Sequence, residues 1–174
     1  MPKGEYTCIE KIQLTSSKEL HFQLVDQNEE KYYGDIRRFV DSQSFTGYTK
    51  KGIQFTLEQL KSLKEILNSI NEIGNMEDAS KIGSIPISDS NSLLIRFKKD
   101  KYTNNIPSID IRKHVESSDY TGFTKDGFRF PLEHRDKFMK NLESLILEID
   151  KRTNENQESK DDSSKIDQVK ENII

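Results

Sequence analysis

The chain has 174 residues, a length that fits one domain or two small ones. Hydrophobic residues make up 32% and charged residues 33%, so part of the chain is expected to lie outside any apolar core. The formal net charge of −3 excludes a binder that relies on overall positive charge, but it allows a local basic surface.

No apolar run is long enough for a membrane span or a signal peptide, so we expect no membrane partner and an intracellular location. That location would be the nucleus in a eukaryote and the cytoplasm or nucleoid in a prokaryote. The single cysteine, Cys8, excludes an internal disulfide and a multi-cysteine zinc site, and we expect it to be buried as a small apolar residue.

The first half of the chain predicts four strands and a helix. Apolar or alternating segments, separated by polar turns, predict strands around residues 9–14, 20–24, 32–40 and 53–55. Thr56 and Gln59 have the spacing of a capping box at a helix start. Apolar residues then recur at three- and four-residue steps from Leu57 to Ile70, which is typical of an amphipathic helix.

The second half repeats the first at a constant offset of 75 residues. Asp35-Ile36-Arg37 recurs as Asp110-Ile111-Arg112, and the register continues without a gap through the predicted helix. Identical pairs include Val40/Val115, Gly47/Gly122, Thr49/Thr124, Lys50/Lys125, Gly52/Gly127, Phe55/Phe130, Leu57/Leu132 and Leu67/Leu142. The chain is therefore predicted to contain two copies of one β-β-β-β-α module.

These patterns predict an α+β protein with four segments. The first repeat is placed at residues 8–71, a linker at 72–84, the second, more divergent repeat at 85–151 and a disordered polar tail at 152–174. One small sheet cannot fully cover the apolar stripe of its own helix, so the two modules are expected to pair through their helices. This arrangement would be a monomer with an internal pseudo-two-fold axis.

A helix on one face of each sheet leaves the other face open for binding. Alternation places Tyr33, Asp35, Arg37 and Phe39 on one side of the third strand. An arginine flanked by rings suits single-stranded nucleic acid, because guanidinium holds phosphate and rings stack on unpaired bases. The alternative is that Asp35 neutralises Arg37 in an ion pair.

The first repeat resembles the positive cofactor four family of transcriptional coactivators. The resemblance rests on Tyr33-Gly-Asp-Ile-Arg-Arg-Phe followed by Tyr48-Thr-Lys-Lys-Gly-Ile-Gln-Phe-Thr-Leu-Glu-Gln-Leu, and it extends more weakly over residues 87–149. It implies a curved four-stranded antiparallel sheet with one helix, a two-fold pairing through the helices, and binding of single-stranded or melted DNA along the sheets.

Carried over by position, the family's strand arginine matches Arg37 and Arg112, its lysine matches Lys51, and its glycines match Gly52 and Gly127. The family often has a tryptophan where this chain has Val40 and Val115, so stacking would fall to other rings. Asp126 replaces the lysine in the second repeat. The full set of expected nucleic-acid-binding residues is Lys31, Tyr33, Arg37, Phe39, Tyr48, Lys50, Lys51, Gly52, Lys98, Lys99, Lys101, Tyr102, Arg112, His114, Phe123, Lys125 and Gly127.

Other chemistries are poorly supported. The three histidines lack metal-ligand spacing, no Gly-rich phosphate loop precedes a helix, and no serine lies in a nucleophile motif. We therefore expect no enzyme, no cofactor and no metal. The leading hypothesis is a single-stranded DNA-binding protein acting in transcription regulation or DNA maintenance, with the transcription machinery as a further partner. The alternatives are an RNA binder and a protein-interaction scaffold that has lost nucleic-acid binding.

Overall fold

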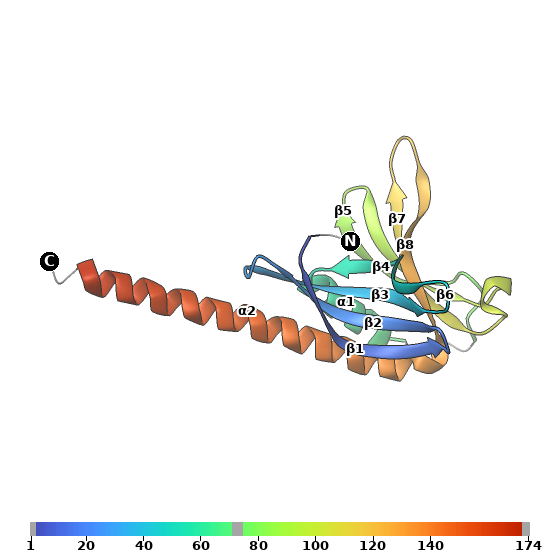
Figure 1. The fold of residues 1–174 in the computed structure, drawn as a ribbon. Coiled ribbons are helices and arrows are strands. Elements are labelled where there is room, and N and C mark those ends of the chain that lie inside the picture. Colours follow the sequence, from blue (N-terminus) through green and yellow to red (C-terminus); the bar gives the residue numbers. More distant parts are fainter. Residues whose placement is uncertain (1–2, 71–74, 172–174) are drawn as a thin grey trace.

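A computed structural model describes residues 3–70 and 75–171 and contains two four-stranded antiparallel sheets, each followed by a helix (Figure 1). The spatial order of strands follows the chain in both sheets, β1-β2-β3-β4 and β5-β6-β7-β8. The strands are β1 (Glu5–Thr15), β2 (Lys18–Gln27), β3 (Lys31–Asp41), β4 (Thr46–Phe55), β5 (Lys81–Ser88), β6 (Asn91–Lys98), β7 (Ser108–Glu116) and β8 (Thr121–Pro131). The helices are α1 (Leu57–Asn68) and α2 (Arg135–Glu171), with short 3-10 turns η2 (Lys101–Thr103) and η3 (Leu132–His134). The predicted α+β fold of two β4α modules is confirmed.

The predicted capping box forms at the start of α1. The Thr56 hydroxyl accepts a hydrogen bond from the Gln59 backbone N–H at 3.2 Å, and the Gln59 side chain accepts one from the Thr56 N–H at 2.9 Å. Both N–H groups would otherwise lack partners at a helix start. In the described part of the chain, neither helix has the length and hydropathy needed to cross a bilayer.

Each helix reaches across to the sheet of the other repeat. α2 lies against β1, β2 and β3 of the first repeat, α1 contacts β5 of the second, and the two helices contact each other (Figure 1). Phe138 of α2 occupies the centre of this arrangement. Its ring stacks on Phe130 at 4.2 Å between centroids and meets Phe22 of the first sheet edge-on at 5.1 Å.

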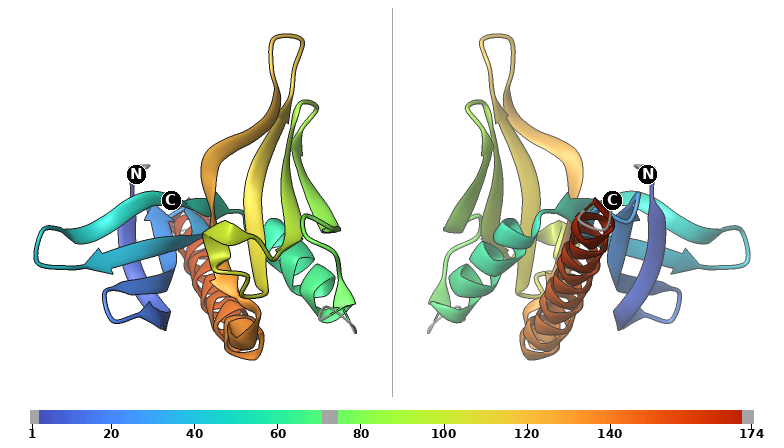
Figure 2. Two further views of the ribbon diagram at one scale, coloured as in Figure 1. Left: turned by 90° about the vertical axis from the view of Figure 1, so that its right-hand side faces the viewer. Right: turned by 90° about the vertical axis from the view of Figure 1, so that its left-hand side faces the viewer.

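The two repeats share one hydrophobic core. Leu60, Leu63 and Leu67 of α1 are buried in the same apolar cluster as Phe138 and Leu142 of α2. β4 and β8 lie beside each other at the junction of the two sheets. Beyond that junction the β3–β4 and β7–β8 hairpins extend in diverging directions (Figure 2). The pairing of the modules inside one chain is therefore a feature of the fold.

Three sequence expectations need correction. α2 continues as a helix to Glu171 instead of giving way to a disordered tail at residue 152. Asn156 anchors part of this extension, because its side-chain amide donates hydrogen bonds to the Tyr32 hydroxyl at 2.7 Å and to the Glu29 carbonyl. β5 begins at Lys81, inside the interval predicted as linker, whose residues 71–74 lie outside the described ranges. Cys8 is exposed on β1, the outermost strand of its sheet, instead of buried.

Replacing Phe138 by alanine should destabilise both repeats together. A buried phenylalanine costs about 3–5 kcal/mol on truncation to alanine, and here the cavity would open between the two sheets. Urea unfolding should show one transition shifted to lower denaturant. Leu147→Ala, at a residue that is 62% exposed on the same helix, is the matched control and should change stability little. Separate transitions for the two repeats in Phe138→Ala would contradict a shared core.

The melting temperatures of two truncations of α2 should distinguish its anchored part from the part beyond the anchor. Removing residues 161–174 should leave the melting temperature unchanged, whereas removing residues 153–174 also deletes Asn156 and its hydrogen bonds to the β2–β3 turn region. We expect the longer deletion to lower the melting temperature by about 2–4 °C, which corresponds to ~1 kcal/mol at this size. Asn156→Ala in the full chain should reproduce most of that drop in a calorimetric scan. Equal melting of both truncations would contradict the anchor.

Candidate nucleic-acid interface

The predicted alternation on β3 is present in the structure. Gly34 and Ile36 face the helices, and a Cβ added to Gly34 would lie 2.8 Å from a Leu60 methyl group. The outer face of the same strand carries Arg37 and Phe39. This outer face has no helix over it, which makes it the candidate interface.

Arg37 is held by a buried carboxylate on that face. Its Nε and Nη2 donate to the two oxygens of Asp35 at 2.9 Å each, and its Nη1 donates to the Thr49 carbonyl at 3.1 Å. Asp35 is fully buried and also accepts from Gln23 at 3.2 Å. Burial acts to lower the pKa of Arg37, but the Asp35 carboxylate outweighs it and raises that pKa above its ordinary value. The ion-pair alternative therefore describes Arg37.

The second repeat has the same acid with more arginines around it. Asp110, also fully buried, accepts from Arg96 at 2.7 Å, from Arg129 at 2.7 Å and from Arg112 at 3.1 Å. Burial acts to raise the pKa of Asp110, but hydrogen bonds from Arg96 and Arg129 and the charge of Arg112 bring it below its ordinary value. Arg129 also pairs with Asp100 at 3.7 Å, and Asp100 is shared with Lys98. The three arginines are therefore only partly neutralised, and this face is more basic than its counterpart in the first repeat.

The two family-pattern glycines allow the strand arginines to lie flat on the sheet. Gly52 is opposite Arg37, and an added Cβ would lie 2.7 Å from the Arg37 Cγ. Gly127 is opposite Arg112, and an added Cβ would lie 2.6 Å from the Ile111 carbonyl oxygen. Both glycines are buried, so their role in this structure is close packing under the arginine.

A ring cluster occupies the outer face of each hairpin at equivalent positions. In the first repeat Phe39 stacks on His21 at 4.7 Å, and Tyr48 meets both rings edge-on. The offset of 75 residues maps these three positions onto Arg96, His114 and Phe123. There the Arg96 guanidinium lies 3.7 Å above the Phe123 ring, and His114 meets the same ring edge-on at 4.9 Å.

A β-bulge beside each cluster presents lysines to solvent. The pairing slips between Arg37 and Phe39, so residues 49–51 of β4 lie opposite Arg38 alone. The Thr49 hydroxyl holds the bulge, donating to the Arg38 carbonyl and accepting from the Lys51 N–H, both at 3.1 Å. The slip recurs in the second repeat, where the Thr124 hydroxyl accepts from the Asp126 N–H. Lys50, Lys51 and Lys125 are exposed and form no ion pair with the described residues.

The expected binding residues fall into three groups of exposure. The exposed ones are Lys31, Lys50, Lys51, Lys99, Lys101, Tyr102, Phe123 and Lys125, and the half-buried ones are Tyr33, Phe39, Tyr48, Arg112 and His114. The buried ones are Arg37, Gly52, Lys98 and Gly127. Lys98 forms ion pairs with Asp78 at 3.2 Å and Asp100 at 3.0 Å, so its charge, like that of Arg37, is compensated within the fold.

Three residues near these clusters were absent from the prediction. His21 and Arg96 complete the ring clusters, and Arg129 completes the arginine group around Asp110. The alternation of β2 and β6 could have placed His21 and Arg96 on the outer face, because each is one residue from an apolar core position.

A comparison of this chain with models of known protein families and with curated protein sequences finds no match. The resemblance to the positive cofactor four family therefore stays a prediction.

Asp110→Asn should reveal how strongly the arginine group depends on its acid. Removing one partner of a buried ion pair costs about 3–5 kcal/mol, and here three arginines lose their shared carboxylate. Because the folded state lowers the pKa of Asp110, its stabilising contribution is present above the unfolded pKa and is lost as the pH falls through the folded one. The stability difference between wild type and variant should be full at pH 7 and shrink below about pH 4. Asp119→Asn, in the exposed β7–β8 turn, is the control, and a pH-independent difference in urea unfolding would contradict this assignment.

Proposed function

We propose that this chain binds single-stranded nucleic acid, with DNA as the first candidate, along the outer faces of its two hairpins. The observation that carries the proposal is the ring cluster that both repeats place beside solvent-exposed, unpaired lysines. Rings provide stacking platforms for unpaired bases, and lysines without acidic partners attract phosphates. The resemblance to the positive cofactor four family supports the same function.

The internal pairing suits such a binder. The two repeats share one hydrophobic core, so a strand that contacts one ring cluster would meet the second without a separate association step. We propose that the chain acts as a monomer with an internal pseudo-two-fold axis. Melted DNA in transcription or DNA maintenance would supply the single strand, and contacts with the transcription machinery belong to the same proposal.

A protein-interaction scaffold is the second candidate, favoured by the ends of the hairpins. Phe45 and Tyr120 occupy equivalent positions in the two turns and are 50% and 52% exposed. Exposed aromatic side chains at a protruding turn also suit a protein partner. The compensated charges of Arg37 and Lys98 further reduce the basic surface of the sheets.

Alanine at Phe39 or Phe123 should weaken binding to oligothymidylate by about tenfold or more. Base–aromatic stacking is worth about 1–3 kcal/mol per base, and Phe123, at 37% exposed, has the more accessible ring. The dependence of affinity on salt should stay nearly unchanged, because neither substitution removes a phosphate contact. Fluorescence polarisation with labelled single-stranded DNA, duplex DNA and RNA at two salt concentrations measures both quantities.

Leu147→Ala, an exposed apolar residue on α2, is the matched control for these two variants and should bind like wild type. Melting curves for each variant report whether the lost ring contributed to folding. Unchanged affinity in both ring variants would leave the scaffold as the better description. Equal affinity for DNA and RNA would mean that the protein stacks on the bases and does not recognise the 2′-hydroxyl.

A further inference from the structure

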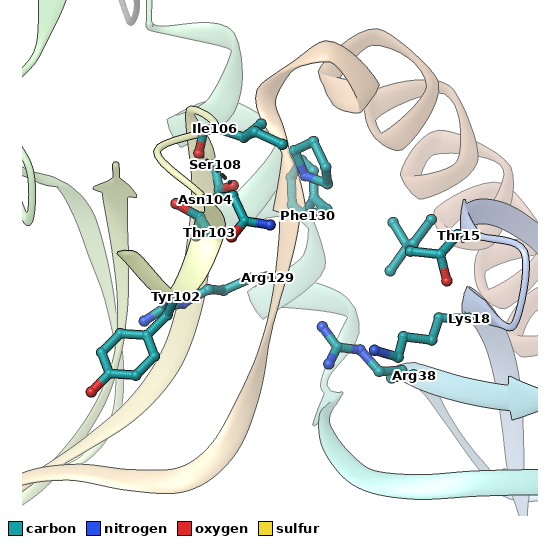
Figure 3. A pocket seen from close by; sticks show the side chains of 12 residues that line it. Thr15, Lys18, Arg38, Tyr102, Thr103, Asn104, Ile106, Ser108, Arg129 and Phe130 are labelled. Carbon is teal, nitrogen blue, oxygen red and sulfur yellow. Dashed lines mark hydrogen bonds between the residues drawn. The ribbon is translucent and has the colours of Figure 1, made fainter. Parts of the chain in front are cut away.

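A cleft of about 330 Å³ lies between the two repeats (Figure 3). Its first-repeat wall comes from the ends of β1 and β2 and from β3, with Lys18 and Arg38 among its residues. Its second-repeat wall comes from β8, with Arg129, and from the loop containing Tyr102 and Asn104. No acidic residue lines this cleft within the described parts of the chain.

The cations of the first-repeat wall have no partners there. Lys18 and Arg38 are diagonal neighbours on the core-side face of β2 and β3, because Lys18 is opposite Val40 and Leu20 is opposite Arg38. The Arg38 side chain forms no hydrogen bond or ion pair with any described residue, and its buried Nε lacks an acceptor. Figure 3 shows both side chains reaching into the space that faces β8. Arg38 is half-buried, and its Nε is a buried donor without an acceptor, which is unfavourable. The positive charge of this side chain therefore lacks a negative partner among the described residues.

Neighbouring cations increase that cost. Burial, followed by the charges of Arg112 and Arg129, lowers the pKa of Arg38 below its ordinary value. The charge of Arg38 is the largest cause of the lowered pKa of Lys51, with burial second and Lys18 next. These shifts agree with the geometry, in which Arg129 on the second-repeat wall is paired with Asp110 and Asp100, whereas Lys18 and Arg38 on the first-repeat wall face it without an acid of their own.

The internal symmetry provides a comparison within the same molecule. A second cleft of about 300 Å³ lies in the equivalent place on the other side and includes Leu93, Lys113, Gln54 and Asp126, together with Arg37, which is paired with Asp35. The offset of 75 residues maps Lys18 to Leu93, Arg38 to Lys113, Arg129 to Gln54 and Lys51 to Asp126. The substitutions between the repeats therefore make the first cleft the more basic of this pair, because Lys18 and Arg38 line it without an acid and Asp126 lines the second.

We propose that this basic cleft binds a backbone phosphate of the single strand, with Arg38 and Lys18 as its main ligands. Tyr102, 80% exposed at the cleft, offers a ring for the adjacent base, and its counterpart in the first repeat is Gln27. A phosphate next to a base fits a nucleotide better than an acidic peptide, because guanidinium binds the phosphate and the ring stacks on the base. The inference rests on the proposed function and adds Arg38 and Lys18, which the sequence did not predict, beside Tyr102, which it did.

The first arm of the test measures binding of labelled oligothymidylate to the full chain. Arg38→Gln should weaken binding at least fivefold and make the log-log salt slope shallower by about 0.7, as expected for one lost phosphate contact on a single strand. Lys113→Gln, at the equivalent position of the second cleft, should change affinity less than twofold. Tyr102→Ala should weaken binding with an unchanged slope. Arg38→Gln should melt no lower than wild type, because Arg38 donates no side-chain hydrogen bond to the described residues.

The second arm needs no nucleic acid. Inorganic phosphate should raise the melting temperature of wild type and of Lys113→Gln above that in chloride of equal ionic strength, but not that of Arg38→Gln. If Phe39→Ala weakens oligonucleotide binding and Arg38→Gln does not, the cleft is not a phosphate site, and the proposed function stands. If phosphate raises the melting temperature only when Arg38 is present, and no oligonucleotide binds, the proposed function is wrong and the cleft is a site for free phosphate. Wild-type behaviour of Arg38→Gln in both arms would overturn the site.

Discussion

The fold depends on the burial of the two sheets' apolar faces against the helices, with α2 against the first sheet and α1 between β5 of the second sheet and β3 and β4 of its own. Phe138 is an example, because its ring contacts Phe130 in its own repeat and Phe22 in the first sheet. A single β4α module would leave much of its sheet or helix stripe in water, at a cost of roughly 25 cal/mol for each Å² of apolar surface. The two modules therefore form one cooperative unit, and the diverging hairpins are held relative to each other by that shared core.

The sequence was informative where structure is local or periodic. The offset of 75 residues predicted the duplication, alternation predicted the strands, and the spacing of Thr56 and Gln59 predicted the start of α1. These features depend on neighbours within one strand or one turn of helix. The packing of α2 on the first sheet depends on contacts between residues more than a hundred positions apart, such as Phe22 and Phe138, and no local pattern encodes it.

The candidate site was harder to predict because charge neutralisation is three-dimensional. The motif around Arg37 could not determine whether the guanidinium faces water or the buried carboxylate of Asp35. In the second repeat, Asp110 of the same motif binds Arg96 and Arg129 from neighbouring strands. The pattern along one strand cannot predict these contacts. The extended α2 was missed for a related reason. Its polar composition suggested disorder, whereas the anchor at Asn156 comes from a turn more than a hundred residues earlier.

Under the proposed function, joining the two modules in one chain has a consequence for the direction of the strand. A dimer of identical subunits has two equivalent halves, so a strand lying across it meets the same surface whichever end enters first. Here Lys18 and Arg38 line one cleft, while Leu93 and Lys113 line its counterpart. A strand with chemically distinct 5′ and 3′ ends would meet unequal halves, and one orientation would have lower free energy than the other. Duplication followed by divergence gives this protein a polarity that a symmetric pair cannot have.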